Sequence, residues 1–175
     1  MMVLIKNRGY PMNLSIAYIF SQILVIAYYL IYSITFHLKN KSKILIFGAM
    51  ATIISSISYF LLNAYTGVAM CFIAILRNAL FHKCKSKSVL IIIYIITLIA
   101  SFFSYQNIFS LLSILATLIY TYSLWQESSK KYKLLGILVN TLMLLYNFSI
   151  MSIMGIVFMI IALINSVMGY IIECK

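Results

Sequence analysis

Side chains able to exchange protons or attack a substrate are scarce in this chain of 175 residues. The only acidic residues are Glu127, which lies in a lysine-rich stretch, and Glu173, which lies at the C-terminus. The two histidines, His37 and His82, flank lysine-rich stretches, and neither is placed within an apolar run to partner a nucleophile. General acid–base and nucleophilic catalysis need such groups placed together. The sequence therefore predicts that the protein is not an enzyme.

Metal and cofactor binding are also disfavoured by the residues present. The three cysteines are Cys71 in an apolar run, Cys84 in a basic stretch and Cys174 near the C-terminus. A zinc site needs about four clustered nitrogen, sulfur or oxygen ligands. No such cluster can be assembled from neighbouring residues of this sequence. We therefore expect no metal and no cofactor, and we expect three unpaired, reduced cysteines.

The polar groups best suited to bind a ligand are two asparagines and one arginine inside apolar runs. An amide donates and accepts hydrogen bonds at once, so Asn78 and Asn165 suit the hydroxyl or amide groups of a neutral polar solute. The same two amides could instead join neighbouring helices by hydrogen bonds. Arg77 is the single charge within an apolar run, and it could bind an anionic group or close a cytoplasmic gate. Alternatively, its long side chain could reach the lipid headgroups near His82 and Lys83.

These residues must be positioned by membrane-spanning helices, because the chain is too apolar to be a soluble domain. Hydrophobic residues make up 65% of the sequence, charged residues make up 9%, and the mean hydropathy is +1.09. Soluble domains carry about 25% charged residues. In lipid, each apolar segment must satisfy its own backbone hydrogen bonds and is therefore helical. The sequence predicts an all-α integral membrane protein with seven transmembrane helices, at residues 14–36, 44–62, 66–81, 89–104, 108–125, 134–148 and 150–172.

The net charge of +11 raises the question of a nucleic-acid partner. However, the cations are concentrated in short connections between apolar runs, where membrane topology places them. Alternate connections carry Lys39, Lys41 and Lys43, then Lys83, Lys85 and Lys87, then Lys130, Lys131 and Lys133. The connections between them carry no Lys or Arg. We expect the basic connections and the C-terminus in the cytoplasm, the N-terminus outside, the lipid bilayer as partner and no nucleic acid.

An internal duplication is suggested by residues that recur at a shift of 87. The shift relates Lys43 to Lys130, Tyr59 to Tyr146, Leu76 to Leu163, and Asn78 to Asn165. A repeat of three helices needs one inverting linker helix if both copies are to point the same way. The sequence thus predicts one membrane domain, 1–175, in a 3+1+3 arrangement. It consists of a first triple-helix repeat at 1–82, linker helix four within 83–105 and a second triple-helix repeat at 106–175.

Two segments carry a resemblance to a known family. Residues 58–81 read SYFLLNAYTGVAMCFIAILRNALF and residues 146–165 read YNFSIMSIMGIVFMIIALIN. They resemble the YgjV-type bacterial inner-membrane proteins, and the 3+1+3 arrangement resembles that of the SWEET and PQ-loop transporters. The resemblance implies a place in the bacterial cytoplasmic (inner) membrane. It also implies that Asn78 and Asn165 match the paired asparagines that bind sugar in SWEET transporters.

Two hypotheses for the function follow. The first is a SWEET-like facilitator or binder of a small neutral polar solute, in which Asn78, Asn165, Arg77, Tyr59 and Tyr146 are the candidate ligand-binding residues. The second is a non-transporting membrane interaction protein, such as an assembly, immunity or signalling partner. A polar cavity between the two halves favours the first, and an axis packed with Leu, Ile and Met favours the second. The sequence also allows a homo-oligomer.

Overall fold

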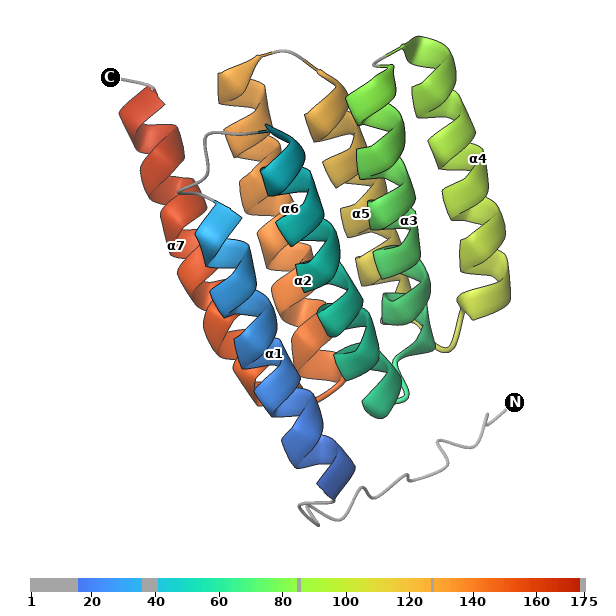
Figure 1. Cartoon of the computed structure of the whole chain (residues 1–175), viewed down its shortest axis with the longest axis vertical. Helices are drawn as coiled ribbons and strands as arrows, with labels where there is room; N and C mark the ends of the chain where they lie inside the picture. The colour runs from blue at the N-terminus through green and yellow to red at the C-terminus, as the bar shows by residue number, and fades with distance from the viewer. Residues whose placement is uncertain (1–15, 36–40, 85, 127, 174–175) are drawn as a thin grey trace, which may run out of the picture.

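The computed structural model describes residues 16–35, 41–84, 86–126 and 128–173 (Figure 1). His37, Lys39, Lys85, Glu127 and Cys174, which are named above, lie outside these residues. The described residues form seven helices, which confirms the all-helical prediction. They are α1 (Ile16–Thr35), α2 (Lys41–Leu61), α3 (Tyr65–Lys83), α4 (Lys87–Ser104), α5 (Ser110–Trp125), α6 (Ser129–Ser149) and α7 (Ile153–Glu173).

Helix α6 begins five residues earlier than its apolar segment. The side chain of Ser128 accepts a hydrogen bond from the backbone N–H of Lys131 and so caps the helix, and α6 thereby includes Lys130, Lys131 and Lys133. A capped N-terminus stabilises a polar first turn that hydropathy does not detect. The basic connection is therefore shorter than the sequence suggested.

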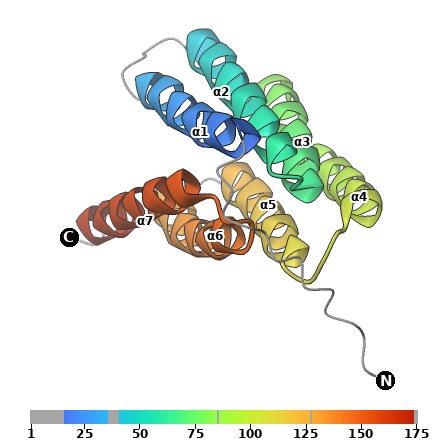
Figure 2. The same ribbon diagram turned by 90° about the horizontal axis from the view of Figure 1, so that it is seen from below.

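The helices lie in two layers (Figure 2). In the first layer α2 packs between α1 and α3, and in the second layer α6 packs between α5 and α7. The layers meet along two edges, where α1 contacts α7 and α3 contacts α5. Helix α4 packs on α3 and α5 and covers the second of these edges. The contacts between helices are therefore the same when each of α1, α2 and α3 is exchanged with α5, α6 and α7.

The turns that follow α2 and α6 have the same backbone geometry. Asn63 and Met151, which lie 88 residues apart, both have a φ of 56°. Each turn closes with equivalent hydrogen bonds, from the N–H of Ala64 to the carbonyl of Tyr59 (2.9 Å) and from the N–H of Ser152 to the carbonyl of Asn147 (3.0 Å). Helices α2 and α6 also begin and end 88 residues apart. The geometry of the two halves thus repeats at 88 residues, one more than the 87 expected from the sequence.

Polar side chains dominate the interior, and large apolar side chains cover the outside. Ser21, Thr66, Thr97, Thr121 and Ser152 are completely buried, with exposures of 0%. By contrast, among the side chains that the structure describes, forty large hydrophobic ones are exposed, with Phe102 and Phe103 at 82% each. Small hydroxyl residues inside and apolar residues outside are typical of helices packed in lipid.

Three of the helices are long and apolar enough to cross a bilayer, judged by length and composition. They are Tyr65–Lys83, Lys87–Ser104 and Ile153–Ile171, with mean hydropathies of 1.3, 2.1 and 2.1. Shorter apolar stretches occupy Ile16–Ile31, Ile46–Leu61 and Ser110–Trp125. At 16 residues, α5 spans about 24 Å, somewhat less than the hydrocarbon thickness of about 30 Å.

Candidate functional site

Arg77 lies inside the bundle, where it joins the two layers. Its side chain is only 3% exposed, and its guanidinium carbon lies 4.7 Å from the centre of the Tyr120 ring on α5. Its Nε donates a hydrogen bond to the side-chain oxygen of Asn78, at 3.3 Å. A guanidinium over a tyrosine face is favourable by about 0.5–2 kcal/mol. The side chain is therefore turned into the protein, which disfavours the interpretation that it reaches the headgroups.

The two asparagines predicted to bind a solute are not brought together. Asn78 is half-buried beside Arg77 on α3, whereas Asn165 is exposed on α7. Helices α3 and α7 do not pack against each other in the described residues (Figure 1). The 88-residue relation pairs Asn165 with Arg77, so the two amides are not equivalent positions of the two halves either.

The two predicted tyrosines do meet, between α2 and α6. The ring centres of Tyr59 and Tyr146 lie 6.0 Å apart, at an angle of 57°. The hydroxyl of Tyr146 accepts a hydrogen bond from the backbone N–H of Gly67 at 3.0 Å, which satisfies a donor in the first turn of α3. A Cβ at Gly67 would lie 2.9 Å from Cγ of Tyr59 and 3.0 Å from the Tyr146 hydroxyl. The close approach of α3 to these rings therefore requires glycine.

Three further tyrosines and a cysteine gather beside this pair. The Tyr29 ring stacks on Phe158 of α7, with ring centres 4.2 Å apart, and the Tyr28 ring lies 4.6 Å from the Tyr29 ring. Cys71 of α3 and Tyr120 of α5 both lie close enough to Tyr28 to interact with it electrostatically. Cys71 likewise interacts with Tyr59 and Tyr146. We call this group the central tyrosine cluster: Tyr28, Tyr29, Tyr59, Tyr120 and Tyr146, together with Cys71.

The central tyrosine cluster was not predicted as a group. Its members come from five helices; Tyr59 and Tyr146 were predicted as candidates from the sequence, whereas Tyr28, Tyr29, Tyr120 and Cys71 were not. Tyr28, Tyr29, Tyr59, Cys71 and Tyr120 are half-buried even though they lie between the two layers. Side chains at such depth that keep accessible surface must border a space that packing does not fill.

Hydrogen bonds join the layers where α1 meets α7. The Tyr18 hydroxyl donates to the backbone carbonyl of Met151 at 3.0 Å. The side-chain oxygen of Gln22 accepts from the backbone N–H of Met154 at 2.9 Å. The second bond satisfies a donor in the first turn of α7 that has no partner within the helix.

The edge between α3 and α5 carries the equivalent bonds. The side-chain nitrogen of Gln106 donates to the backbone carbonyl of Asn63 at 2.8 Å, and the Thr66 and Ser110 hydroxyls are hydrogen-bonded at 3.0 Å, with the Ser104 carbonyl as the nearer acceptor for the Thr66 hydroxyl. Every residue in these two bonds lies 88 positions from its counterpart at the other edge. A shift of 88 residues therefore relates the two hydrogen bonds at one edge to the two hydrogen bonds at the other edge. Together they form what we call the charge-free latch: Tyr18, Gln22, Asn63, Thr66, Gln106, Ser110, Met151 and Met154.

The charge-free latch lies at one end of the bundle, opposite the lysine-bearing connections (Figure 1). Burial is also concentrated toward the latch. Ser152 and Gly155 at the start of α7 are buried, whereas none of its residues 156–171 is. In α6, none of the described side chains of residues 130–138 is buried, and in α3 none of 78–83 is. In α3, α6 and α7 burial therefore falls toward the lysine-bearing end, whereas α5 keeps Thr121 and Ser123 buried there, at 0% and 1% exposure.

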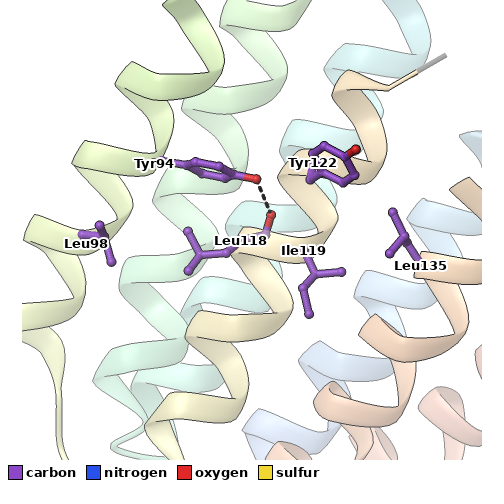
Figure 3. Close-up of a pocket in the computed structure, with 6 residues that line it drawn as sticks. All are labelled: Tyr94, Leu98, Leu118, Ile119, Tyr122 and Leu135. Carbon is purple, nitrogen blue, oxygen red and sulfur yellow. Dashed lines mark hydrogen bonds between the residues drawn. The ribbon is translucent and has the colours of Figure 1, made fainter. Parts of the chain in front are cut away.

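A separate apolar groove of about 390 Å³ lies between α4, α5 and α6 (Figure 3). It is lined by Tyr94, Leu98, Leu118, Ile119, Tyr122 and Leu135. The Tyr94 hydroxyl donates to the carbonyl of Leu118 at 3.4 Å, which satisfies the polar atom nearest the groove. Leu98 and Tyr122 are exposed at 57% and 41%, so the groove lies on the outer surface and not between the halves.

These features define a helical membrane protein with an apolar exterior and a polar interior. A comparison with family models places residues 19–172 in the Imp-YgjV family, described as bacterial inner membrane protein. The chain therefore belongs to this family, as its sequence motifs predicted. No curated protein and no solved structure matches the chain significantly.

Proposed function

We propose that the protein is a SWEET-like facilitator that passes a small neutral polar solute across the bacterial inner membrane. In this proposal all seven helices cross the bilayer, α1–α3 and α5–α7 are two copies of one unit, and α4 is the inverting linker. The lysine-bearing connections then lie in the cytoplasm. The observation that carries the proposal is the charge-free latch, in which equivalent bonds close both edges of one end.

A latch at one end is what alternating access needs. Two halves related by a two-fold exchange can rock against each other, so that the ends open in turn. The latch contains four hydrogen bonds between the halves, each worth about 0.5–1.5 kcal/mol net. Opening the charge-free end would then cost on the order of 2–6 kcal/mol, which solute binding or thermal fluctuation can supply. A larger apolar interface at the same place would not open on a useful timescale.

The interior favours an uncharged solute that moves without coupling to protons. Hydroxyl and amide groups make up most of its polar surface, and such groups donate and accept hydrogen bonds without adding charge. Proton-coupled carriers usually hold an ionisable group on the pathway. The only acids of the chain, Glu127 and Glu173, lie outside the apolar segments of the sequence or at their C-terminal limit. The proposal accordingly includes neither coupling nor catalysis, and it includes no metal, cofactor or nucleic-acid partner.

Uptake into vesicles tests the proposal. The protein is reconstituted into liposomes, and the flux of radiolabelled monosaccharides, polyols and small amides is compared with that of empty liposomes. We expect flux of at least one solute, and we expect it to change when both edges of the latch are weakened in a Tyr18→Phe, Gln106→Leu double variant. Tyr105→Phe, an exposed tyrosine at the same end, is the matched control and should behave as the wild type.

Absence of flux for every solute, with protein that remains folded and monodisperse, would contradict the proposal. That result would favour the non-transporting interaction protein instead. Equal flux in the latch variant and the control would show that transport does not depend on the latch. It would remove the main support for alternating access.

A further inference from the structure

The two layers are joined by backbone contact at their outer helices and not at their middle helices. The outer helices of each layer touch those of the other, at α1–α7 and α3–α5, but α2 and α6 do not come into backbone contact in the described residues. Tyr59 and Tyr146 bridge the gap between α2 and α6 beside the charge-free latch. Whether the gap between α2 and α6 continues toward the lysine-bearing end depends on the side chains there.

On the face of α2 that carries Tyr59, the side chains become smaller toward the lysine-bearing end. Successive turns of this face present Tyr59, Ser55, Thr52 and Gly48, because residues 3, 4, 7 and 11 apart share one side of a helix. All four are half-buried. A Cβ added at Gly48 would meet no other atom within 4 Å. Side chains on this face therefore become smaller from Tyr59 toward the lysine-bearing end, and the position next to Gly48 is open.

The other sides of this space are formed by the central tyrosine cluster. Cys71 faces it from α3, with its sulfur 4.0 Å from the Ser55 hydroxyl. Cys71 and Tyr120 of α5 both lie within electrostatic range of Tyr28 of α1, and the Arg77 guanidinium rests on the Tyr120 ring toward the lysine-bearing end. Cys71 is the seventh residue of α3, so it lies about 9 Å along the helix from its charge-free end.

We propose that the solute-binding site is the space around Cys71, bounded by Tyr28, Tyr59 and Tyr120, and that it is entered from the lysine-bearing end past Gly48. This inference rests on the proposed function and locates its site away from the Asn78–Asn165 pair. The ligand class follows from the lining. Tyrosine hydroxyls donate to oxygen acceptors and the rings stack on an apolar face. The site suits a small uncharged molecule that presents hydroxyl or carbonyl oxygens on one side and C–H groups on the other.

Chemical labelling of Cys71 tests the site without knowledge of the solute. A Cys84→Ser, Cys174→Ser variant retains Cys71 as its only thiol and is exposed, in vesicles, to a charged, membrane-impermeant methanethiosulfonate from one side at a time. A second variant, Cys71→Ser, Cys174→Ser, retains the exposed Cys84 between α3 and α4 and identifies the lysine-bearing side. We expect Cys71 to react from the same side as Cys84 and not from the other.

Two matched controls separate an aqueous site from thiol reactivity in general. Phe72→Cys, in a background lacking the three native cysteines, places a thiol at the same depth on a side chain that is 62% exposed to lipid. It should react at least about 10-fold more slowly than Cys71, because the reagent attacks a thiolate reached through water. Gly48→Phe should slow Cys71 labelling by a similar factor, since a ring there fills the entrance. Met50→Phe, a half-turn away and 48% exposed, should leave the labelling rate unchanged.

No labelling of Cys71 from either side, in protein whose Cys84 reacts normally, would overturn the proposed site. Labelling that Gly48→Phe does not slow would overturn the proposed entrance. These outcomes differ from a failure of the transport proposal. Flux without Cys71 labelling would support the facilitator and show that its binding site lies elsewhere. Cys71 labelling without flux would support the site and indicate a protein that binds a solute without transporting it.

Discussion

Gly155 provides the sharpest test of the packing at the charge-free end. A Cβ at this position would collide with the side-chain oxygen of Asn147 and lie 2.6 Å from the Ser152 hydroxyl. Neither neighbour can move freely, because Asn147 is 2% exposed and Ser152 is 0% exposed. The side-chain nitrogen of Asn147 also donates to the carbonyl of Met143 at 2.8 Å, which fixes the amide against α6. Gly155→Ala must therefore strain or displace this amide.

The magnitude follows from three contributions. Overpacking a tight site costs about 1–3 kcal/mol. Loss of the hydrogen bond between Asn147 and Met143 adds about 1 kcal/mol. The greater helix propensity of alanine offsets about 0.5–1 kcal/mol of this. We expect Gly155→Ala to lower the free energy of unfolding by about 1–3.5 kcal/mol and, at roughly 2–4 °C per kcal/mol for a chain of this size, to lower Tm by about 2–14 °C.

The assay is thermal denaturation of detergent-purified protein, followed by the monodisperse fraction that remains after heating. Gly169→Ala is the matched control, because a Cβ there would meet only the Lys133 side chain, at 3.9 Å, so the propensity gain should leave Tm equal or slightly higher. Gly67→Ala, at the equivalent position of the first half, should destabilise as Gly155→Ala does. A Gly155→Ala protein as stable as the Gly169→Ala protein would refute the reasoning about this contact.

Three further predictions concern single contacts, each read by the same thermal assay. Tyr146→Phe removes the acceptor of a buried backbone N–H and should cost about 1–2 kcal/mol, whereas Tyr105→Phe at the surface should cost nothing measurable. Arg77→Lys and Tyr120→Leu should be coupled by about 0.5–2 kcal/mol in a double-mutant cycle, because the guanidinium rests on that ring, and additive effects would contradict this contact. Met151→Gly should raise stability by about 1 kcal/mol because it relieves a positive φ, and Met151→Ala should not raise it.

Hydropathy and loop charge were sufficient to predict seven helices and their order, and the motifs at residues 58–81 and 146–165 were sufficient to predict the family. They were not sufficient to predict the register of the two halves. The 87-residue shift was anchored on Tyr59 and Asn78, residue types that recur by chance in an apolar chain. Glycines carry stronger register information, because they are required where backbones approach closely. Gly67 and Gly155 lie 88 residues apart, and so do Gly48 and Gly136, a signal that was present in the sequence.

The site could not be predicted for a different reason. Hydrogen bonds and ring contacts between layers depend on which helix faces are turned toward each other, and apolar patterning is weak evidence for this when both the lipid and the interior accept apolar groups. Tyr28 and Cys71 are 43 residues apart in the sequence and become neighbours only through the packing of the two layers. Arg77 was recognised as unusual in the sequence, but its contact with Tyr120 also depends on that packing.

The turns and the bounds of α2 and α6 recur 88 residues apart in the two halves, but the side chains at equivalent positions differ. Under the proposed function, this difference bears on mechanism. The 88-residue relation pairs Tyr59 with Asn147 and Arg77 with Asn165, so one half contributes an aromatic ring and a cation where the other contributes amides. The latch, in contrast, keeps equivalent bonds at both edges even though its residue types differ. Under the proposed function, equivalent bonds would let both edges open together, and unequal side chains would let the proposed site hold an asymmetric solute in one orientation.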